Sequence, residues 1–102
     1  MGWNTVAKAD EVAVGAAVVV DVAGKRLALC NTGEGIFAID DVCTHDGGPL
    51  DQGQLDGKEI ECPRHGARFD VTTGRALCLP AVRPVRTYPV RIEDGEVEVD
   101  LP

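Results

Sequence analysis

Short apolar runs separated by turn-forming residues occupy both ends of the chain. Residues 18–22, 27–30 and 36–39 are rich in β-branched or apolar side chains, with glycine-containing turns between them. This pattern predicts a meander of short strands. Residues 90–92 and 97–99 alternate apolar and charged side chains, which is typical of a hairpin with one face in solvent. No segment has a convincing helical period, and residues 10–14 allow a short helical turn at most.

The middle of the chain differs from both flanks because glycine and proline interrupt it densely between residues 43 and 80. Frequent glycine and proline residues favour loops and tight hairpins. We therefore expect one all-β domain over residues 1–102. Its antiparallel β-sandwich base would comprise residues 1–42 and 81–102, and a smaller, loop-rich subdomain would comprise residues 43–80.

Charge narrows the range of partners. The 102 residues include 17 acidic and 10 basic side chains, a formal net charge of -7, so nucleic acid and anionic membranes are disfavoured as partners.

The N-terminus has no basic stretch followed by an apolar run, and no segment is long enough to cross a bilayer. We expect a cytoplasmic protein in a reducing compartment, and a monomer. Arg64, Arg68 and Arg75 either contact an acidic partner or form an ordinary solvated face.

The candidate chemistry lies in two short motifs, Cys43-Thr44-His45 and Cys62-Pro63-Arg64-His65. Each motif follows a strand-like run and precedes a glycine, where a tight turn can aim two side chains the same way. A disulfide framework is disfavoured because the sequence has no secretion signal and both cysteines are followed closely by histidine. Thiolate and imidazole ligands together suit zinc or iron–sulfur chemistry.

The spacing of the ligands favours iron over zinc. Structural zinc sites usually group cysteine with cysteine and histidine with histidine, whereas each motif here mixes one of each. Mixed motifs fit a two-iron cluster, with two cysteines on one iron and two histidines on the other. Zinc held by the same four side chains remains the alternative.

The chain resembles the Rieske family of [2Fe-2S] proteins. The resemblance rests on the two cysteine–histidine motifs, with Gly47-Gly48-Pro49-Leu50 after the first, and with Gly66, Phe69-Asp70 and Thr73-Gly74 after the second. It implies a Rieske-type fold with a base and a cluster-binding subdomain, and one [2Fe-2S] cluster held by Cys43, His45, Cys62 and His65. It also implies that Leu79-Pro80-Ala81 covers the cluster. The histidines would then mark a docking face surrounded by Arg64, Gly47, Gly48 and Pro80.

Departures from the family pattern predict a low reduction potential. Respiratory members join their two ligand loops by a disulfide, but Gly48 and Arg64 occupy those positions here. In the same members a serine and a tyrosine donate hydrogen bonds to the cluster sulfurs, and Ala67 and Phe69 here have no hydroxyl. Fewer donors stabilise the reduced cluster less, so we expect a potential near the bottom of the Rieske range of about -150 to +300 mV.

The resemblance implies a one-electron carrier rather than an enzyme. The chain has no nucleophile paired with a base, no phosphate-binding glycine loop and no room for a catalytic domain. As similar ferredoxins do, it would receive electrons from a flavin-dependent NAD(P)H reductase and deliver them to a terminal ring-hydroxylating oxygenase. Two alternatives are the small subunit of an assimilatory nitrite reductase and a ferredoxin of iron–sulfur assembly or redox sensing.

Four further residues carry structural predictions. Cys30 and Cys78 lie in apolar runs without a nearby histidine, so we expect buried free thiols rather than ligands. We expect Trp3 and Tyr88 to anchor the core.

Overall fold

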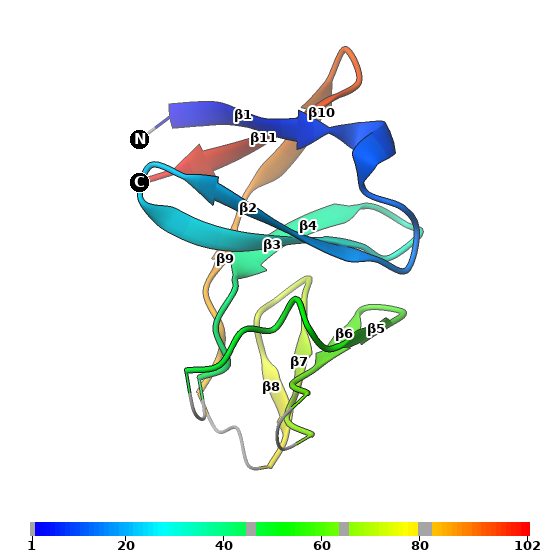
Figure 1. Cartoon of the computed structure of the whole chain (residues 1–102), viewed down its shortest axis with the longest axis vertical. Coiled ribbons are helices and arrows are strands. Elements are labelled where there is room, and N and C mark those ends of the chain that lie inside the picture. Colours follow the sequence, from blue (N-terminus) through cyan, green and yellow to red (C-terminus); the bar gives the residue numbers. More distant parts are fainter. Residues whose placement is uncertain (1, 45–46, 64–65, 80–82) are drawn as a thin grey trace.

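The computed structural model describes residues 2–44, 47–63, 66–79 and 83–102. These residues form a larger base and a smaller lobe, stacked along the long axis of a molecule of 39 × 26 × 19 Å (Figure 1). The base contains β1 (Gly2–Lys8), β2 (Ala17–Val22), β3 (Lys25–Asn31), β4 (Ile36–Asp40), β9 (Thr87–Tyr88), β10 (Val90–Glu93) and β11 (Glu96–Leu101), and the lobe contains β5 (Gln54–Asp56), β6 (Glu59–Glu61), β7 (Arg68–Asp70) and β8 (Ala76–Cys78).

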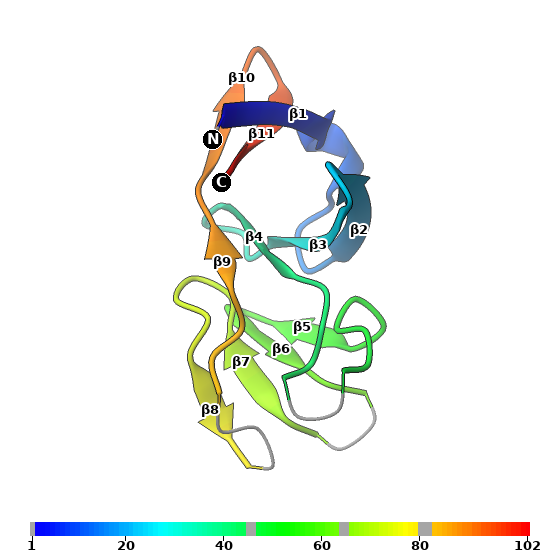
Figure 2. The same ribbon diagram turned by 90° about the vertical axis from the view of Figure 1, so that its left-hand side faces the viewer.

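Two antiparallel sheets build the base, in the strand orders β1-β11-β10 and β2-β3-β4-β9. Figure 2 shows the two sheets curving around a common interior. Alternation along β11 follows the predicted hairpin pattern, because Val97, Val99 and Leu101 are buried between more exposed acidic residues. These three side chains pack with Leu27, Leu29 and other apolar residues into a base core.

Strand β3 serves both parts of the molecule because it is buried on both faces. Leu27 and Leu29 face the base core, whereas Ala28 and Cys30 belong to a second core that extends into the lobe. Successive side chains of a strand point to opposite faces, so a continuous apolar run is what a strand between two cores requires. The base core and the second core therefore pack on opposite faces of the sheet that contains β3.

Two-residue turns close two of the hairpins in the base, β2–β3 and β10–β11. The β2–β3 turn places Ala23 and Gly24 at φ +51° and +77°, and the β10–β11 turn places Asp94 and Gly95 at φ +52° and +76°. Positive φ at both central residues is the requirement of a type I′ turn, whose twist matches that of the flanking strands. Each of these hairpins thus has the expected glycine-containing turn, at Ala23-Gly24 and at Asp94-Gly95.

The lobe contains one antiparallel sheet of order β5-β6-β7-β8. Its strands are only three residues long, and Ile60 on β6 pairs with Phe69 on β7. Both side chains are fully buried in the second core, together with Leu50 and Val71. The short strands leave most of the lobe in turns, as the density of glycine and proline predicted.

The all-β class and the predicted strands are confirmed. The only helical element in the described ranges is a 3-10 turn, Ala9–Glu11, which begins one residue before the predicted turn. No helix within those ranges has the length and apolarity needed to cross a membrane. Boundaries of the cluster-binding subdomain at residues 43 and 80 stay a prediction, and residues 80–82 lie outside the described residues.

The two aromatic anchors behave differently. Tyr88 is buried in the base core, as predicted. The prediction for Trp3 is wrong, because its side chain is 40% exposed and the Arg91 guanidinium lies 4.2 Å from its ring centroid. Trp3 lies on the outer face of β1, where a cation–π contact replaces core packing.

Candidate metal centre

The first ligand loop closes through two backbone hydrogen bonds. The N–H of Cys43 donates to the carbonyl of Gly48 at 2.7 Å, and the N–H of Gly47 donates back to the carbonyl of Cys43 at 2.7 Å. Gly47 has φ +78°, a conformation that side chains other than glycine rarely adopt. The turn therefore depends on the glycine that follows the motif.

The second ligand loop repeats this closure. The N–H of Cys62 donates to the carbonyl of Ala67 at 2.6 Å, and the N–H of Gly66 donates to the carbonyl of Cys62 at 3.1 Å. Gly66 has φ +75°. Two segments separated in sequence thus adopt one hydrogen-bonding pattern, with a cysteine at the first position and a glycine at the fifth.

The two cysteines at these equivalent positions lie in one core. Cys43 is 0% exposed and Cys62 is 1% exposed, and both pack in the second core with Ile60, Phe69 and Val85. Thiolates are soft ligands for iron, and a buried pair needs a compensating cation. His45 and His65 lie outside the described residues, so the four-ligand set stays a prediction.

The two loops fit a [2Fe-2S] cluster. Each contributes one buried sulfur from a closed turn, and in sequence each cysteine is followed within three residues by one of the two histidines. Two thiolates and two neutral imidazoles form the donor set of a Rieske centre. The residues present thus match the group that the family resemblance implies.

The surroundings of the cysteines are poor in hydrogen-bond donors at the two positions singled out from the sequence. Ala67 and Phe69 are both fully buried in the second core, and neither has a hydroxyl. Their burial is consistent with the low-potential prediction, because neither side chain can donate to a cluster sulfur.

The other two cysteines have different environments. Cys30 is a fully buried free thiol, as predicted, and burial followed by the negative charge of Asp41 raises its pKa to about 12. The prediction for Cys78 is wrong, because this free thiol is exposed. Cys78 is the last residue of the three-residue strand β8, which lies at the edge of its sheet. The next residue, Leu79, is 77% exposed, so the apolar neighbours of Cys78 did not indicate burial.

The three arginines near the motifs also differ. Arg68 forms ion pairs of 3.1 Å with both Glu59 and Glu61, so its charge is engaged within the lobe. Arg75 is exposed, and Arg64 lies outside the described residues. Of the residues expected around the docking face, Gly47 is exposed, but Gly48 is buried and cannot contribute a contact. The expectation for Gly48 is wrong because its carbonyl closes the first loop.

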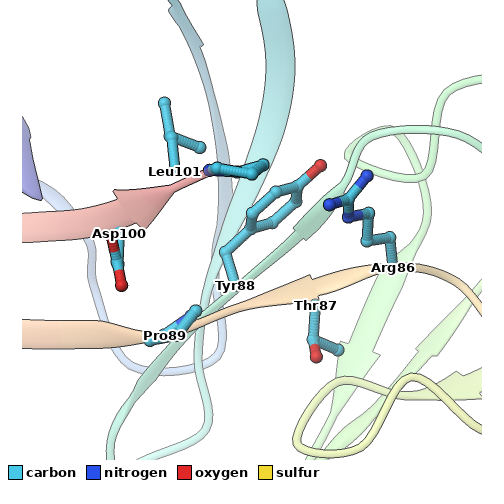
Figure 3. Close-up of a pocket in the computed structure, with 7 residues that line it drawn as sticks. Arg86, Thr87, Tyr88, Pro89, Asp100 and Leu101 are labelled. Atoms are coloured by element: carbon cyan, nitrogen blue, oxygen red, sulfur yellow. The ribbon is translucent and has the colours of Figure 1, made fainter. Parts of the chain in front are cut away.

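A pocket of about 310 Å³ lies in the base, lined by β9 and the end of β11 (Figure 3). The Tyr88 hydroxyl there donates to Asp40 Oδ1 at 2.5 Å, and the Arg86 guanidinium lies 5.4 Å from the Tyr88 ring centroid. None of the residues that line the pocket belongs to either ligand loop. The pocket is therefore not assigned to the metal centre.

Sequence reasoning did not single out Asp41. Its side chain is fully buried, and its carboxylate accepts hydrogen bonds from the backbone N–H groups of Leu50 and Asp51. A carboxylate two residues before a candidate ligand cysteine, at the end of an apolar strand, is the signal that could have indicated it.

Comparisons with known proteins agree with this geometry. The family model of the Rieske [2Fe-2S] domain matches residues 2–89. The ferredoxin component of a naphthalene 1,2-dioxygenase system from Pseudomonas aeruginosa is 46% identical over 99 residues, which cover 97% of this chain and 95% of that protein.

Two solved structures are similar over nearly the whole chain. A ferredoxin from Sphingomonas yanoikuyae B1 has a TM-score of 0.94 at 39% identity, covering 99% of this chain and 100% of that one. A chain in a complex of reduced oxygenase and oxidized ferredoxin of carbazole 1,9a-dioxygenase has a TM-score of 0.90 at 37% identity, covering 95% and 91%. The chain belongs to the Rieske [2Fe-2S] domain family.

Proposed function

We propose that this chain is the ferredoxin of a ring-hydroxylating dioxygenase system and carries single electrons on one [2Fe-2S] cluster. Cys43 and Cys62 would bind one iron, and His45 and His65 the other. The observation that supports this assignment best is the shared closure of the two loops, which places a buried cysteine at the same position of each.

When bound, the cluster supplies a pair of irons that accepts and releases one electron. The chain contributes a binding site from which water is excluded and whose loops have a fixed conformation. Burial of Cys43 and Cys62 excludes water from the sulfur ligands, and the backbone hydrogen bonds hold each loop in one conformation. A preformed site of this kind changes little between its oxidised and reduced states, which favours rapid electron exchange.

The partners follow from the relatives. The similar Pseudomonas protein is the ferredoxin component of a naphthalene 1,2-dioxygenase system, and a similar structure is of a complex between oxygenase and ferredoxin. By analogy, this chain would accept electrons from a flavin-dependent NAD(P)H reductase and pass them to a terminal oxygenase. We place it in the cytoplasm as a monomer, and its net charge of -7 suits a partner surface that is basic or mixed.

A reconstitution assay tests the proposal. Anaerobically purified protein should contain iron and acid-labile sulfide in equal amounts, and its dithionite-reduced form should give a rhombic paramagnetic signal with an average g below two. The reduced protein should then be reoxidised by a ring-hydroxylating oxygenase with aromatic substrate and oxygen present. A colourless protein that contains zinc without sulfide would refute the cluster.

The same preparation separates the proposed pathway from its alternatives. Stable co-purification with a large siroheme-containing subunit would identify a nitrite reductase instead. Transfer of iron and sulfide to an acceptor apoprotein, without oxygenase-dependent reoxidation, would identify a role in cluster assembly.

A further inference from the structure

Asp41 connects, by hydrogen bonds, the two ends of the segment that contains the first ligand loop. It follows β4, and its Oδ1 atom accepts the N–H groups of Leu50 at 2.9 Å and Asp51 at 2.7 Å. One carboxylate oxygen thus closes a segment of the chain that contains Cys43 and, in sequence, His45.

The other carboxylate oxygen connects this segment to the base. Asp41 Oδ2 lies 2.9 Å from Arg26 Nε on β3, and the backbone N–H of Asp41 donates to the carbonyl of Arg26 at 3.0 Å. The Asp41 side chain is 0% exposed, whereas that of Arg26 is 52% exposed. Loss of Arg26 would leave the buried Asp41 carboxylate without its cation, whereas loss of Asp41 would leave the half-exposed Arg26 a longer contact of 3.9 Å to Asp51.

The two ligand loops differ in what holds their ends. The second loop is flanked by β6 and β7, and Glu61 pairs with Arg68 across that ladder directly beside the loop. The first loop lies between β4 and β5, which belong to different sheets, so no ladder joins its ends. The Asp41 carboxylate supplies for the first loop the closure that strand pairing supplies for the second.

The negative charge of Asp41 also acts within the core that contains the candidate ligands. Asp41 is a fully buried side chain whose carboxylate has the Arg26 guanidinium and two backbone N–H groups as donors, which are the partners that a buried negative charge requires. Its charge is the second cause, after burial, of the raised pKa of Cys30. Cys30 packs in the same core as Cys43 and Cys62, where negative charge from Asp41 opposes further negative charge.

We propose that Asp41, held by Arg26, is a positioning residue for the first cluster-ligand loop, and that its buried charge lowers the reduction potential of the cluster. This inference rests on the proposed function in taking Cys43 as a ligand. Asp41 acts through the backbone of residues 50–51 and through its field, not by touching the cluster.

The first test compares Asp41→Asn with Asp70→Asn. These are the two buried aspartates among the described residues, at 6% and 7% exposure, and both accept backbone N–H groups and pair with a cation. Asp70 lies at the end of β7, outside both ligand loops. In the cluster-loaded protein, Asp41→Asn should speed hydrogen exchange of the Leu50 and Asp51 amides about tenfold, whereas Asp70→Asn should leave these two amides at the wild-type rate.

The second test uses the sign of the change in potential. Asp41→Asn removes a negative charge and should favour reduction by about threefold, equivalent to about 28 mV at 59 mV per tenfold for one electron. Arg26→Met removes the compensating positive charge and should lower the potential, by less, because Arg26 is half exposed. Potentials would be measured at about pH 7.5, well above the ordinary carboxyl range. A merely structural role would not give shifts of opposite sign.

The outcomes are distinguishable. Shifts of the same sign in both variants, or Leu50 and Asp51 amides that exchange at the wild-type rate in Asp41→Asn, would overturn this inference while leaving the cluster assignment intact. If Asp41→Asn fails to fold, Arg26→Met alone decides, and an unchanged or raised potential in that variant would also overturn the inference. Wild-type protein without iron and sulfide would instead refute the proposed function.

Discussion

The base and the lobe are both antiparallel β-structures, yet they are held together differently. Base strands such as β1 and β3 are seven residues long and enclose an apolar core of their own. Lobe strands are three residues long, and the second core that supports them includes the two candidate ligand cysteines and residues of β3 and β4. From this difference we expect the base to fold on its own core and the lobe to depend on the base and on the proposed cluster.

Replacing a ligand should give the largest effect and tests this contrast directly. Cys62→Ser should abolish cluster binding, because serine is a poor ligand for iron, and the lobe should lose protection of its Ile60 and Phe69 amides. Base amides such as those of Leu29 and Val99 should stay protected. Visible absorption and hydrogen exchange followed by NMR provide the two measurements.

Cys78→Ser is the matched control, because it makes the same atomic change at an exposed thiol. This variant should bind the cluster as the wild type does. If Cys62→Ser left the lobe amides fully protected, the lobe would not need its metal, and the contrast with the base would fail.

Truncation of one large side chain in each core should give the next largest effect. Phe69→Ala should cost about 3–5 kcal/mol and Leu29→Ala about 2–5 kcal/mol of unfolding free energy, since both side chains are fully buried. The two variants should differ in which property of the protein they change most. Phe69→Ala should speed cluster loss more than its stability loss accounts for, whereas Leu29→Ala should lower the unfolding midpoint of the base.

Urea unfolding and the rate of cluster bleaching, both measured on the holoproteins, check this pair of variants. Equal bleaching rates in Phe69→Ala and Leu29→Ala would show that the two cores stabilise the cluster equally.

Backbone packing gives a third comparison. Gly53 in the lobe has no room for a side chain, because a Cβ atom there would lie 1.7 Å from the carbonyl oxygen of Glu61. Gly53→Ala should therefore force a backbone shift that costs about 1–3 kcal/mol. Gly95→Ala, in the open β10–β11 turn at φ +76°, should cost about 1 kcal/mol through conformation alone. Thermal unfolding of both variants measures the difference, and a smaller loss in Gly53→Ala than in Gly95→Ala would contradict it.

The sequence predicted the base better than the details of the lobe, for a physical reason. Long strands carry a readable period, so residues 97–99 and the apolar run 27–30 were placed correctly. Short edge strands have too few residues to show such a period. Cys78 was therefore expected to be buried because its neighbours are apolar, whereas its thiol is exposed. Trp3 was misplaced similarly, since a contact with Arg91 leaves no mark in the local pattern.

The loops of the candidate site could be predicted from the sequence, but the contacts that support them could not. The spacing of the cysteine–histidine motifs indicated which loops matter, and the loops that begin at Cys43 and Cys62 do share one geometry. The position of Asp41 beside Cys43 could have marked it as a candidate, but its proposed role depends on β4 and β5 belonging to different sheets and on Arg26 from a third strand. Such tertiary relations have no short-range signature in the sequence.

A small effect is also predicted for Tyr88 in the base. Burial, followed by the hydrogen bond and charge of Asp40, raises the pKa of Tyr88 to about 12, against about 10 in an unfolded chain. The folded state therefore holds this proton more tightly, so the stabilisation is complete below about pH 10 and is lost as the pH rises through about 12. Tyr88→Phe should lose about 1–2 kcal/mol of unfolding free energy at neutral pH with the hydrogen bond. Its stability should fall less steeply than that of the wild type between about pH 10 and 12, and chemical denaturation across this range would measure both slopes. Equal slopes would mean that the Tyr88–Asp40 pair does not hold the base together at the edge beside the lobe.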